Sequence, residues 1–223
     1  MRRFVIGDIH GRYKALKEVF KKSSFDYDKD KLIILGDVVD GGYNTNLVVE
    51  ELLKIKNKIF IIGNHDEWFM NHIRSGWAEQ IWLSQGGRET LSSYKDQKIP
   101  VIHQEFFNKG KYYHVEDKMV FVHAGFTPDL HPSKERKFTL VWDRDLIKYA
   151  RAGNVIKQWE SVFVGHTTTQ TYGSTKPIKF NNLWMLDCGA GFTGKLCIMD
   201  IDTKDYWLSK SQPNDALIGL EEV

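Results

Sequence analysis

The chain has 223 residues, 42% of them hydrophobic and 27% charged, which is the composition of an ordinary globular protein and excludes a largely disordered one. Its formal net charge of +2 gives no reason to expect general binding to nucleic acid or to a membrane surface. No apolar stretch reaches the roughly 18 to 20 residues of a membrane span, and the N-terminal apolar run is too short for a signal peptide. We therefore expect a cytoplasmic protein, in which Cys188 and Cys197 are reduced thiols.

The first third of the chain alternates between short apolar runs and helical patterns. The runs at 3–7, 32–36 and 59–63 are rich in Ile and Val, as expected for central strands of a largely parallel sheet. Apolar residues at helical spacing within 13–22 and 45–55 predict two helices between these strands. This alternation predicts βαβ units and therefore an α/β fold.

The middle of the chain is rich in Trp and helical in pattern. We expect the segment at about 67–110 to form a helical lid, inserted into a single domain that spans 1–223. Three tryptophans of this segment, Trp68, Trp77 and Trp82, are expected to pack in the core of the lid, with a base-stacking shelf as the less favoured interpretation.

Strand patterns return in the second half. Apolar runs at 112–115 and 119–122 flank three polar residues and predict a hairpin. The segment 138–157 is helical or irregular in pattern. Further strands are expected at 161–165, 183–186, 196–201 and 206–208. From about Gln212 the chain is expected to be a loose tail.

Five of the predicted strands are followed by side chains that can bind a metal ion. In α/β sheets, ligands and substrates bind beyond the carboxyl ends of the strands, so we expect these side chains to lie at one edge. Six of them are candidate ligands: Asp8, His10, Asp37, Asn64, His123 and His166. A polar residue after one strand is commonly a turn, but five such strands in one chain indicate a shared site.

The donor types indicate which metals this site would take. Oxygen and imidazole donors without a thiolate suit Mn, Fe, Zn or Co and suit a Ca site or a structural Zn site poorly. Six ligands are too many for one ion with open positions, but they fit two ions that share one carboxylate. Two ions roughly 3.5–4 Å apart can hold a hydroxide and clamp the oxygens of a phosphoryl group during in-line displacement.

These motifs resemble the five sequence blocks of the calcineurin-like metallophosphoesterases. The blocks are Asp8-Ile9-His10, Gly36-Asp37-Val38-Val39-Asp40, Gly63-Asn64-His65-Asp66, His123-Ala124-Gly125 and Gly165-His166-Thr167. In order and length the chain is most similar, from residue 4 to about 200, to the small lambda-phage-type protein phosphatases of the phosphoprotein phosphatase family. The resemblance implies two mixed β-sheets that pack face to face as a sandwich, with flanking helices and a helical lid.

The resemblance also implies a role for each residue of the site. Asp8 and His10 would bind the first metal, Asp37 would bridge both metals, and Asn64, His123 and His166 would bind the second. His65 would be the general acid that protonates the leaving oxygen. Asp40 would orient His65 and keep it charged, because an imidazole beside two cations otherwise loses its proton.

Two arginines are candidates for contact with the substrate. By resemblance, Arg144 in the Trp142-x-Arg144 motif would contact the substrate phosphate. The chain departs from the family at Gly41-Gly42, where the family carries an Arg that is a second phosphate contact. Arg88, from the lid, could supply a replacement charge. The smaller positive charge leaves phosphodiesters and pyrophosphates open as substrates.

We therefore expect a metal-dependent phosphoric ester hydrolase that cleaves phosphomonoesters of a protein or a small molecule by in-line attack of a metal-bridging hydroxide. The expected cofactors are two divalent ions, Mn²⁺ in the first place, with Fe, Zn or Co as alternatives. A nucleotide-directed enzyme, either a dinucleoside polyphosphate hydrolase or a phosphodiesterase, is the alternative within this chemistry. A catalytically inactive binding module is the alternative of another class, although a binder needs neither the full ligand set nor the His–Asp pair.

Overall fold

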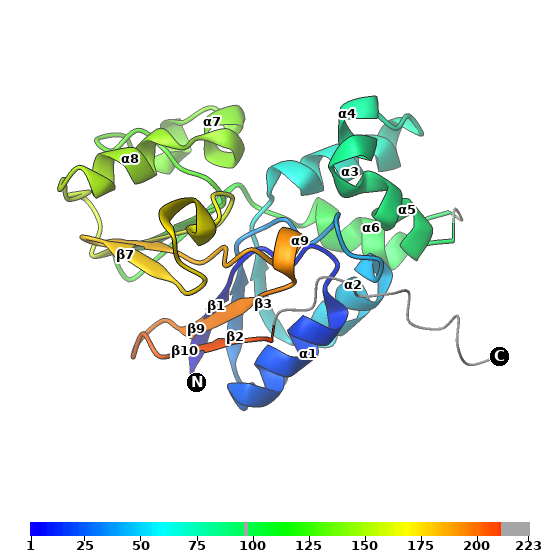
Figure 1. Cartoon of the computed structure of the whole chain (residues 1–223), viewed down its shortest axis with the longest axis horizontal. Coiled ribbons are helices and arrows are strands. Elements are labelled where there is room, and N and C mark those ends of the chain that lie inside the picture. Colours follow the sequence, from blue (N-terminus) through cyan, green and yellow to red (C-terminus); the bar gives the residue numbers. More distant parts are fainter. Residues whose placement is uncertain (96–97, 211–223) are drawn as a thin grey trace.

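The fold is built on two five-stranded mixed sheets (Figure 1). The coordinates are a computed structural model that describes residues 1–95 and 98–210, so the tail expected from about Gln212 lies outside the described residues. The first sheet has the order β10-β9-β1-β2-β3. Its strands are β1 (Arg3–Ile6), β2 (Lys31–Ile34), β3 (Asn57–Phe60), β9 (Cys197–Asp200) and β10 (Tyr206–Leu208). The strands β1, β2 and β3 are parallel, as the βαβ pattern predicted, whereas β9 and β10 are antiparallel to their neighbours.

The second sheet has the order β4-β5-β6-β8-β7. Its strands are β4 (Tyr113–Glu116), β5 (Met119–Val122), β6 (Ser161–Val164), β7 (Ile178–Phe180) and β8 (Leu183–Met185). The hairpin of β4 and β5 is present as predicted, and β5, β6 and β8 are parallel. The edge strand β7 was not predicted. It is only three residues long, and none of the three is fully buried, so it carries little hydrophobic signal.

Side chains of β1 show how the layers pack. Phe4 and Ile6 point toward the helices on the outer face of the first sheet, whereas Val5 points toward the second sheet. Between the sheets, Val5 shares a core with Phe121 and Phe163, whose rings stack with centroids 4.9 Å apart. Each side chain of this size stabilises the fold by about 1.5–3 kcal/mol when fully buried. The sandwich of two sheets is thus confirmed.

Helices cover the outer faces of both sheets. On the first sheet these are α1 (Tyr13–Lys22) and α2 (Thr45–Leu53), and along the second sheet lie α7 (Lys137–Trp142) and α8 (Asp145–Arg151) (Figure 1). Three short helical turns follow the strands of the second half: η2 (Pro132–Lys134), η3 (Thr169–Tyr172) and α9 (Ala190–Thr193). Among the described residues, no helix combines the length and the apolar character needed to cross a membrane.

The predicted lid consists of helices. They are α3 (Asn64–Ser75), α4 (Gln80–Trp82), η1 (Leu83–Gly87), α5 (Arg88–Ser93) and α6 (Val101–Asn108). The first of them begins at Asn64, three residues before the expected start of the lid, because the Asp66 side chain accepts the backbone N–H of Gly63 and caps the helix. These helices pack at one end of the first sheet, beside α2 (Figure 1).

The tryptophans of the lid have three different environments. Trp82 is 1% exposed and packs against Phe69 in the core, as expected. Trp77 is 69% exposed, so the expectation that it packs in the core is wrong. Trp68 is half-buried and lines a cavity beside the predicted ligands. The sequence could not separate these cases, because each depends on where a helix faces in the folded chain.

Candidate active site

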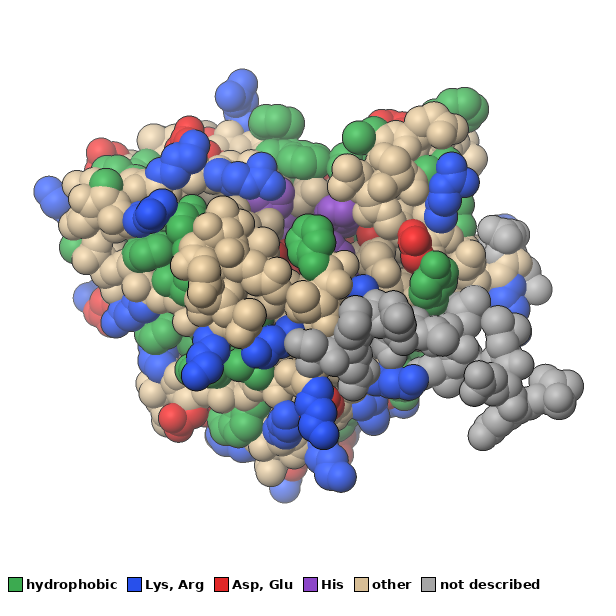
Figure 2. All heavy atoms as spheres, in the orientation of Figure 1, with side chains coloured by type: hydrophobic (Ala, Val, Ile, Leu, Met, Phe, Trp, Pro, Cys, Tyr) green, Lys and Arg blue, Asp and Glu red, His purple; other side chains and the backbone are tan. Residues whose placement is uncertain are grey.

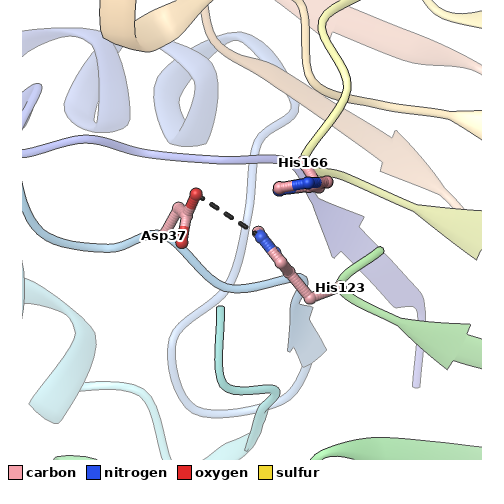
Figure 3. Close-up of side chains that lie close together, drawn as sticks. All are labelled: Asp37, His123 and His166. Carbon is pink, nitrogen blue, oxygen red and sulfur yellow. Dashed lines mark ion pairs between the residues drawn. The ribbon is translucent and has the colours of Figure 1, made fainter. Parts of the chain in front are cut away.

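The six predicted ligands lie just beyond the ends of five strands. Asp8 and His10 follow β1, Asp37 follows β2, Asn64 follows β3, His123 follows β5 and His166 follows β6. Both sheets therefore contribute to one site, in agreement with the expected edge. Figure 3 shows Asp37, His123 and His166 converging from three separate segments, with the carboxylate of Asp37 directed at the His123 ring.

Asp37 is shared by two groups of possible metal ligands. Asp8, His10 and Asp37 form one group, and Asp37, His123 and His166 form the other, each with donor atoms within 4.8 Å of one another. Oδ2 of Asp37 lies 3.8 Å from Nε2 of His10 and 3.4 Å from Nε2 of His123. This arrangement corresponds to the expected pair of ions with one shared carboxylate.

Asn64 belongs to the second of these groups by position. Its Oδ1 lies 3.0 Å from Nε2 of His123 and 2.9 Å from Nδ1 of His166. Because Asn64 is the first residue of α3, the start of the helix fixes the position of its backbone. The structure thus brings together all six residues that the sequence singled out as ligands.

Two donor atoms of the site are buried without a hydrogen-bond partner among the described residues: Oδ1 of Asp8 and Nε2 of His166. Buried polar atoms are normally paired, because an unpaired one costs about 1–3 kcal/mol. A divalent cation would satisfy both a carboxylate oxygen and an imidazole nitrogen. The donor set therefore fits the two metal ions that the family resemblance implies.

Burial sets the protonation of the imidazoles. It lowers the pKa of His10 to about 4 and, with the charge of His123 beside it, lowers the pKa of His166 to about 3. For His123, burial also opposes protonation, but the charge of Asp37 outweighs it and the pKa lies above its usual value. His10 and His166 are thus neutral near pH 7, which is the form that binds a metal.

Carboxylates crowd the same site. Burial raises the pKa of Asp8 well above its usual range, and the charges of Asp187 and Asp37 raise it further. For Asp37, burial alone would raise the pKa. The charges of His123 and His65 outweigh burial, so the pKa of Asp37 is lowered. Several buried carboxylates so close together repel one another unless cations lie between them.

Several site residues have a backbone conformation that is uncommon outside glycine. The φ angles of His10, Asp37, Asp40 and His166 are 50°, 46°, 72° and 58°. Such conformations cost on the order of 1–3 kcal/mol each and persist only where the surrounding structure holds them. Four of the eight residues that were predicted to bind metal or to form the acid pair have such a conformation. The chain therefore gives up some stability to direct these side chains.

Asp66 holds two of the ligand loops together. Its carboxylate accepts backbone N–H bonds from Asp37 at 2.7 Å, Val38 at 3.0 Å and Gly63 at 2.9 Å. Burial, with the charge of Asp37, raises the pKa of Asp66 to about 7. Gly63 itself must be glycine, because a Cβ there would lie 2.1 Å from Oδ1 of Asp37. The sequence placed Asp66 in a motif but did not assign it this role.

The predicted acid pair is present. Nδ1 of His65 lies 2.7 Å from Oδ2 of Asp40, which has no exposed surface. Burial raises the pKa of Asp40. Burial also disfavours the charged form of His65, but the charge of Asp37 and the hydrogen bond to Asp40 outweigh it and raise the pKa of His65. His65 thus retains a proton more readily than a free imidazole.

Two residues of the lid hold the side chain of Asp40 by hydrogen bonds. Nε1 of Trp82 donates to Oδ2 of Asp40 at 2.9 Å, and the Thr90 hydroxyl donates to Oδ1 at 2.7 Å. The Thr90 hydroxyl also accepts the backbone N–H of Asp40 at 2.9 Å. The sequence analysis expected Trp82 in the core of the lid and did not single out Thr90. It assigned neither of them a contact with Asp40, because both bonds span more than forty positions of the chain.

The two candidate arginines differ in position. Arg144, at the start of α8, lines the cavity that contains the ligands, and its charge adds to the burial and the His123 charge that lower the pKa of His166. Arg88 is exposed at the first residue of α5 and is not among the residues that line this cavity. Gly41 lies in the cavity wall with a φ of +80°, so an arginine in its place would be strained.

The cavity has a volume of about 380 Å³. Four of the predicted ligands, His10, Asp37, Asn64 and His166, form part of its lining together with His65. Its sides include large apolar side chains: Trp68, Ile81, Trp142 and Phe192. Figure 2 shows His side chains inside a hollow of the surface, with hydrophobic side chains around it. Among the described residues of the lining, Arg144 is the one Lys or Arg.

A further carboxylate, Asp187, was missed by the sequence analysis. It is 5% exposed, lines the cavity, and accepts the backbone N–H of Gly189 at 2.9 Å. Burial raises its pKa to about 6. Asp187 follows the end of β8 by two residues, so the rule that located the other candidates, a polar residue after a strand, could have found it.

Comparisons with known proteins agree with this geometry. The sequence model of the family described as calcineurin-like phosphoesterase matches residues 1–182. A bis(5'-nucleosyl)-tetraphosphatase PrpE [asymmetrical] of Bacillus cereus (strain Q1) is 27% identical, and the match covers 88% of this chain and 89% of that protein.

Solved structures with the same fold include two phosphatases of different kinds. A structure provisionally described as a diadenosine tetraphosphatase has a TM-score of 0.70 and 18% identity, with 96% of this chain and 95% of that chain covered. A protein serine/threonine phosphatase from Saccharomyces cerevisiae has a TM-score of 0.59 and 14% identity, with 95% and 80% covered. At these identities, the two structures support the fold alone.

Proposed function

Because this chain belongs to the calcineurin-like phosphoesterase family and is a metal-dependent phosphoric ester hydrolase, we propose that its substrate is a nucleoside polyphosphate of the dinucleoside tetraphosphate class. The observation that carries the proposal is the match to a bis(5'-nucleosyl)-tetraphosphatase over nearly the whole length of both chains. It favours the nucleotide-directed alternative over the phosphomonoester substrate that the sequence analysis placed first.

The charge of the cavity also supports this substrate. Arg144 is the one Lys or Arg among the described residues of the lining, and Gly41 stands where a second arginine was expected. A terminal phosphomonoester brings about two negative charges near pH 7, whereas an internal phosphate of a polyphosphate chain brings one. A site with one guanidinium therefore suits a phosphate inside a chain better than a terminal one.

Each residue of the site has a role in the proposed reaction. Two divalent ions, which we expect to be Mn²⁺, would be held by the six ligands and would supply charge neutralisation and activation of water for in-line displacement. Arg144 binds oxygens of the phosphate, and a bidentate contact fixes its orientation. His65 gives its proton to the leaving oxygen, and Asp40 holds His65 in the correct orientation.

Substrate profiling tests the proposal directly. The Mn²⁺-loaded protein is assayed with diadenosine tetraphosphate, a phosphoserine peptide, p-nitrophenyl phosphate and bis-p-nitrophenyl phosphate. We expect kcat/KM for diadenosine tetraphosphate to exceed that for the peptide by at least about tenfold, which corresponds to 1.4 kcal/mol. The Asp37→Asn variant, which lacks the shared carboxylate, serves as the control for contaminating phosphatases.

A phosphomonoesterase is the second candidate function. The observation that favours it is the position of Arg144 in the cavity, where the Trp142-x-Arg144 motif predicted a phosphate contact. A higher kcat/KM for the phosphoserine peptide than for diadenosine tetraphosphate would establish this candidate and refute the nucleotide proposal.

A further inference from the structure

The cavity has an apolar side that the proposed chemistry does not use. Phe192 is 72% exposed and Ile81 is 52% exposed, although both line a cavity of carboxylates and imidazoles. Trp68 and Trp142 line the same cavity and are half-buried. Metal binding and phosphate transfer need none of these side chains. Large apolar side chains exposed beside a polar site indicate contact with an apolar part of a ligand.

Trp68 and Trp142 form an aromatic wall beside the second group of ligands. Their ring centroids lie 5.3 Å apart with the planes at 70°, and the Phe138 ring stacks with the Trp142 ring at a centroid distance of 6.2 Å. The Trp68 ring is 5.1 Å from the ring of His65, and the Trp142 ring is 5.8 Å from that of His166. A ligand whose phosphate is held by the metal ligands therefore has an aromatic surface directly beside it.

Phe192 is next in sequence to Gly191, which lies close to His10 of the other group of ligands. It belongs to α9, and the neighbouring Gly191 packs so closely on His10 that a Cβ there would lie 3.0 Å from Cδ2 of the imidazole. The buried Arg12 holds this turn by donating from Nε to the carbonyl of Ala190 at 3.0 Å. In Figure 1, α9 lies below the gap between α7 and the lid helices. Phe192 is thus an exposed ring on a turn whose backbone is held by Arg12.

We propose that Trp142, Trp68 and Phe192 bind the nucleobase of the substrate by stacking, next to the phosphate that is cleaved. This proposal rests on the proposed function and identifies what the site recognises besides phosphate. Aromatic side chains stack with every base, because every base has a π-face. The cavity of about 380 Å³ is at the lower end of the roughly 300–1,000 Å³ of ligand cavities, so it accommodates one nucleotide end of the substrate and not both.

Equilibrium binding tests the proposal without turnover. Adenosine 5'-monophosphate and ribose 5-phosphate carry the same phosphate and sugar, but only the first carries a base. We expect calorimetry on the metal-free and on the Mn²⁺-loaded protein to show tighter binding of adenosine 5'-monophosphate by about five- to hundredfold, the range for stacking one base. In Phe192→Ala the preference should fall substantially, and in Trp77→Ala it should stay as in the wild type, because Trp77 is equally exposed but outside the cavity.

Steady-state kinetics provides the second arm. Inorganic tripolyphosphate has phosphoanhydride bonds but no base. The ratio of kcat/KM for diadenosine tetraphosphate to that for tripolyphosphate therefore measures the contribution of the nucleoside to recognition. We expect this ratio to fall by about five- to hundredfold in Phe192→Ala. Trp142→Leu is the second variant, with metal content measured to confirm that the adjacent site is intact.

The outcomes separate this inference from the proposed function. If diadenosine tetraphosphate is the preferred substrate but Phe192→Ala and Trp142→Leu leave both the binding preference and the kinetic ratio unchanged, the aromatic wall has no role in recognition of the base. Equal binding of the two ligands by the wild type also overturns the inference. If a phosphotyrosine peptide is hydrolysed with a higher kcat/KM than diadenosine tetraphosphate, the rings serve an aryl phosphate, and both proposals are wrong.

Discussion

Nδ1 of His65 and Oδ2 of Asp40 lie 2.7 Å apart, and Asp40 is completely buried beneath the helices of the lid. The hydrogen bond and the charge of Asp37 hold the pKa of His65 above its usual value, although burial opposes this. A proton on His65 is thereby kept at a position that lines the cavity beside Asn64.

Replacement of His65 by Asn should leave the metal site intact and remove the proton donor. We expect a loss of about 10²–10⁴-fold in kcat for substrates with a poor leaving group, because general acids contribute this much. The loss should be smaller for p-nitrophenyl phosphate, whose leaving group needs less protonation. Metal content and kcat are measured for aryl and alkyl esters in parallel. An equal loss with both kinds of ester would refute the role of His65 as an acid.

Replacement of Trp82 by Phe should weaken the same pair from the lid. The variant retains most of the buried ring but loses the N–H that bonds to Asp40. Hydrogen bonds to charged groups are worth about 1.5–3 kcal/mol, so we expect kcat to fall about tenfold or more. Because Asp40 then holds a negative charge less readily, the pKa of His65 should fall and the alkaline limb of the pH–rate profile should move to lower pH.

Trp159→Phe is the matched control for Trp82→Phe. Nε1 of Trp159 is also buried, but it has no hydrogen-bond partner among the described residues, and Trp159 does not line the cavity. It should leave the pH–rate profile unchanged. If Trp82→Phe loses only stability while its pH–rate profile also stays unchanged, the Trp82 hydrogen bond does not position the acid.

Removal of the metal ions should lower stability as well as activity. Oδ1 of Asp8 and Nε2 of His166 then remain buried without partners. We expect a lower Tm after chelation, and recovery of both Tm and kcat with Mn²⁺ but poor recovery of kcat with Mg²⁺, since three of the six ligands are imidazoles. Ions are added back singly, with Tm and kcat read together. Full activity with Mg²⁺ alone would contradict the ligand assignment.

Asp187→Asn should weaken metal binding. The buried carboxylate contributes negative charge to the cavity, and after burial its charge is the largest influence on the raised pKa of Asp8. We expect the affinity for at least one metal ion to fall by about 10–100-fold, as for residues that support ligands from behind. Equilibrium dialysis with metal analysis measures this, and Asp145→Asn, an exposed side chain on α8, is the control. Unchanged affinities would show that Asp187 has no part in the metal site.

Glu116→Gln should make the free energy of unfolding less sensitive to pH in the acidic range. Ion pairs with Arg3 and Lys31 and a hydrogen bond from His114 outweigh burial and hold the pKa of Glu116 at about 2. Because the folded pKa lies below the unfolded value, this stabilisation is present above about pH 4.5 and is lost as the pH falls toward 2.

The variant should therefore be less stable than the wild type by about 1 kcal/mol near neutral pH, the scale of partly exposed ion pairs, and the difference should shrink as the pH falls toward 2. Denaturant unfolding over this pH range measures the difference. Glu160→Gln removes a more exposed partner of Lys118 and should show almost no difference at any pH. A stability difference between Glu116→Gln and wild type that does not shrink between pH 4.5 and pH 2 would exclude the ion pairs as its source.

The sequence was sufficient to predict most of the strands and to group the candidate ligands for a simple reason. Short buried strands are continuous apolar runs, and the residue after each run reaches the same edge of the sheet, so the pattern alone groups Asp8, Asp37 and His123. The strand boundaries shifted by a few residues. The strand predicted at 59–63 is Asn57–Phe60, because backbone pairing with β2 and not hydrophobicity defines it.

What the sequence could not supply depends on which surfaces meet in three dimensions. The hydrogen bonds of Trp82 and Thr90 to Asp40 connect segments separated by more than forty residues, and no local pattern encodes them. The aromatic wall has the same origin, since Trp68 and Trp142 belong to different halves of the chain. Asp187 is different, because its position after a strand was visible and only its burial in the cavity was not.

The two lid contacts of Asp40 limit how substrate can enter. If the helices of the lid swung outward, the hydrogen bonds from Trp82 and Thr90 to Asp40 would break, and His65, the proposed acid, would lose its orientation at each cycle. We therefore expect the lid to stay in place during turnover, so that substrate reaches the candidate ligands through the cavity as it stands, which Trp142 and Phe192 help to line.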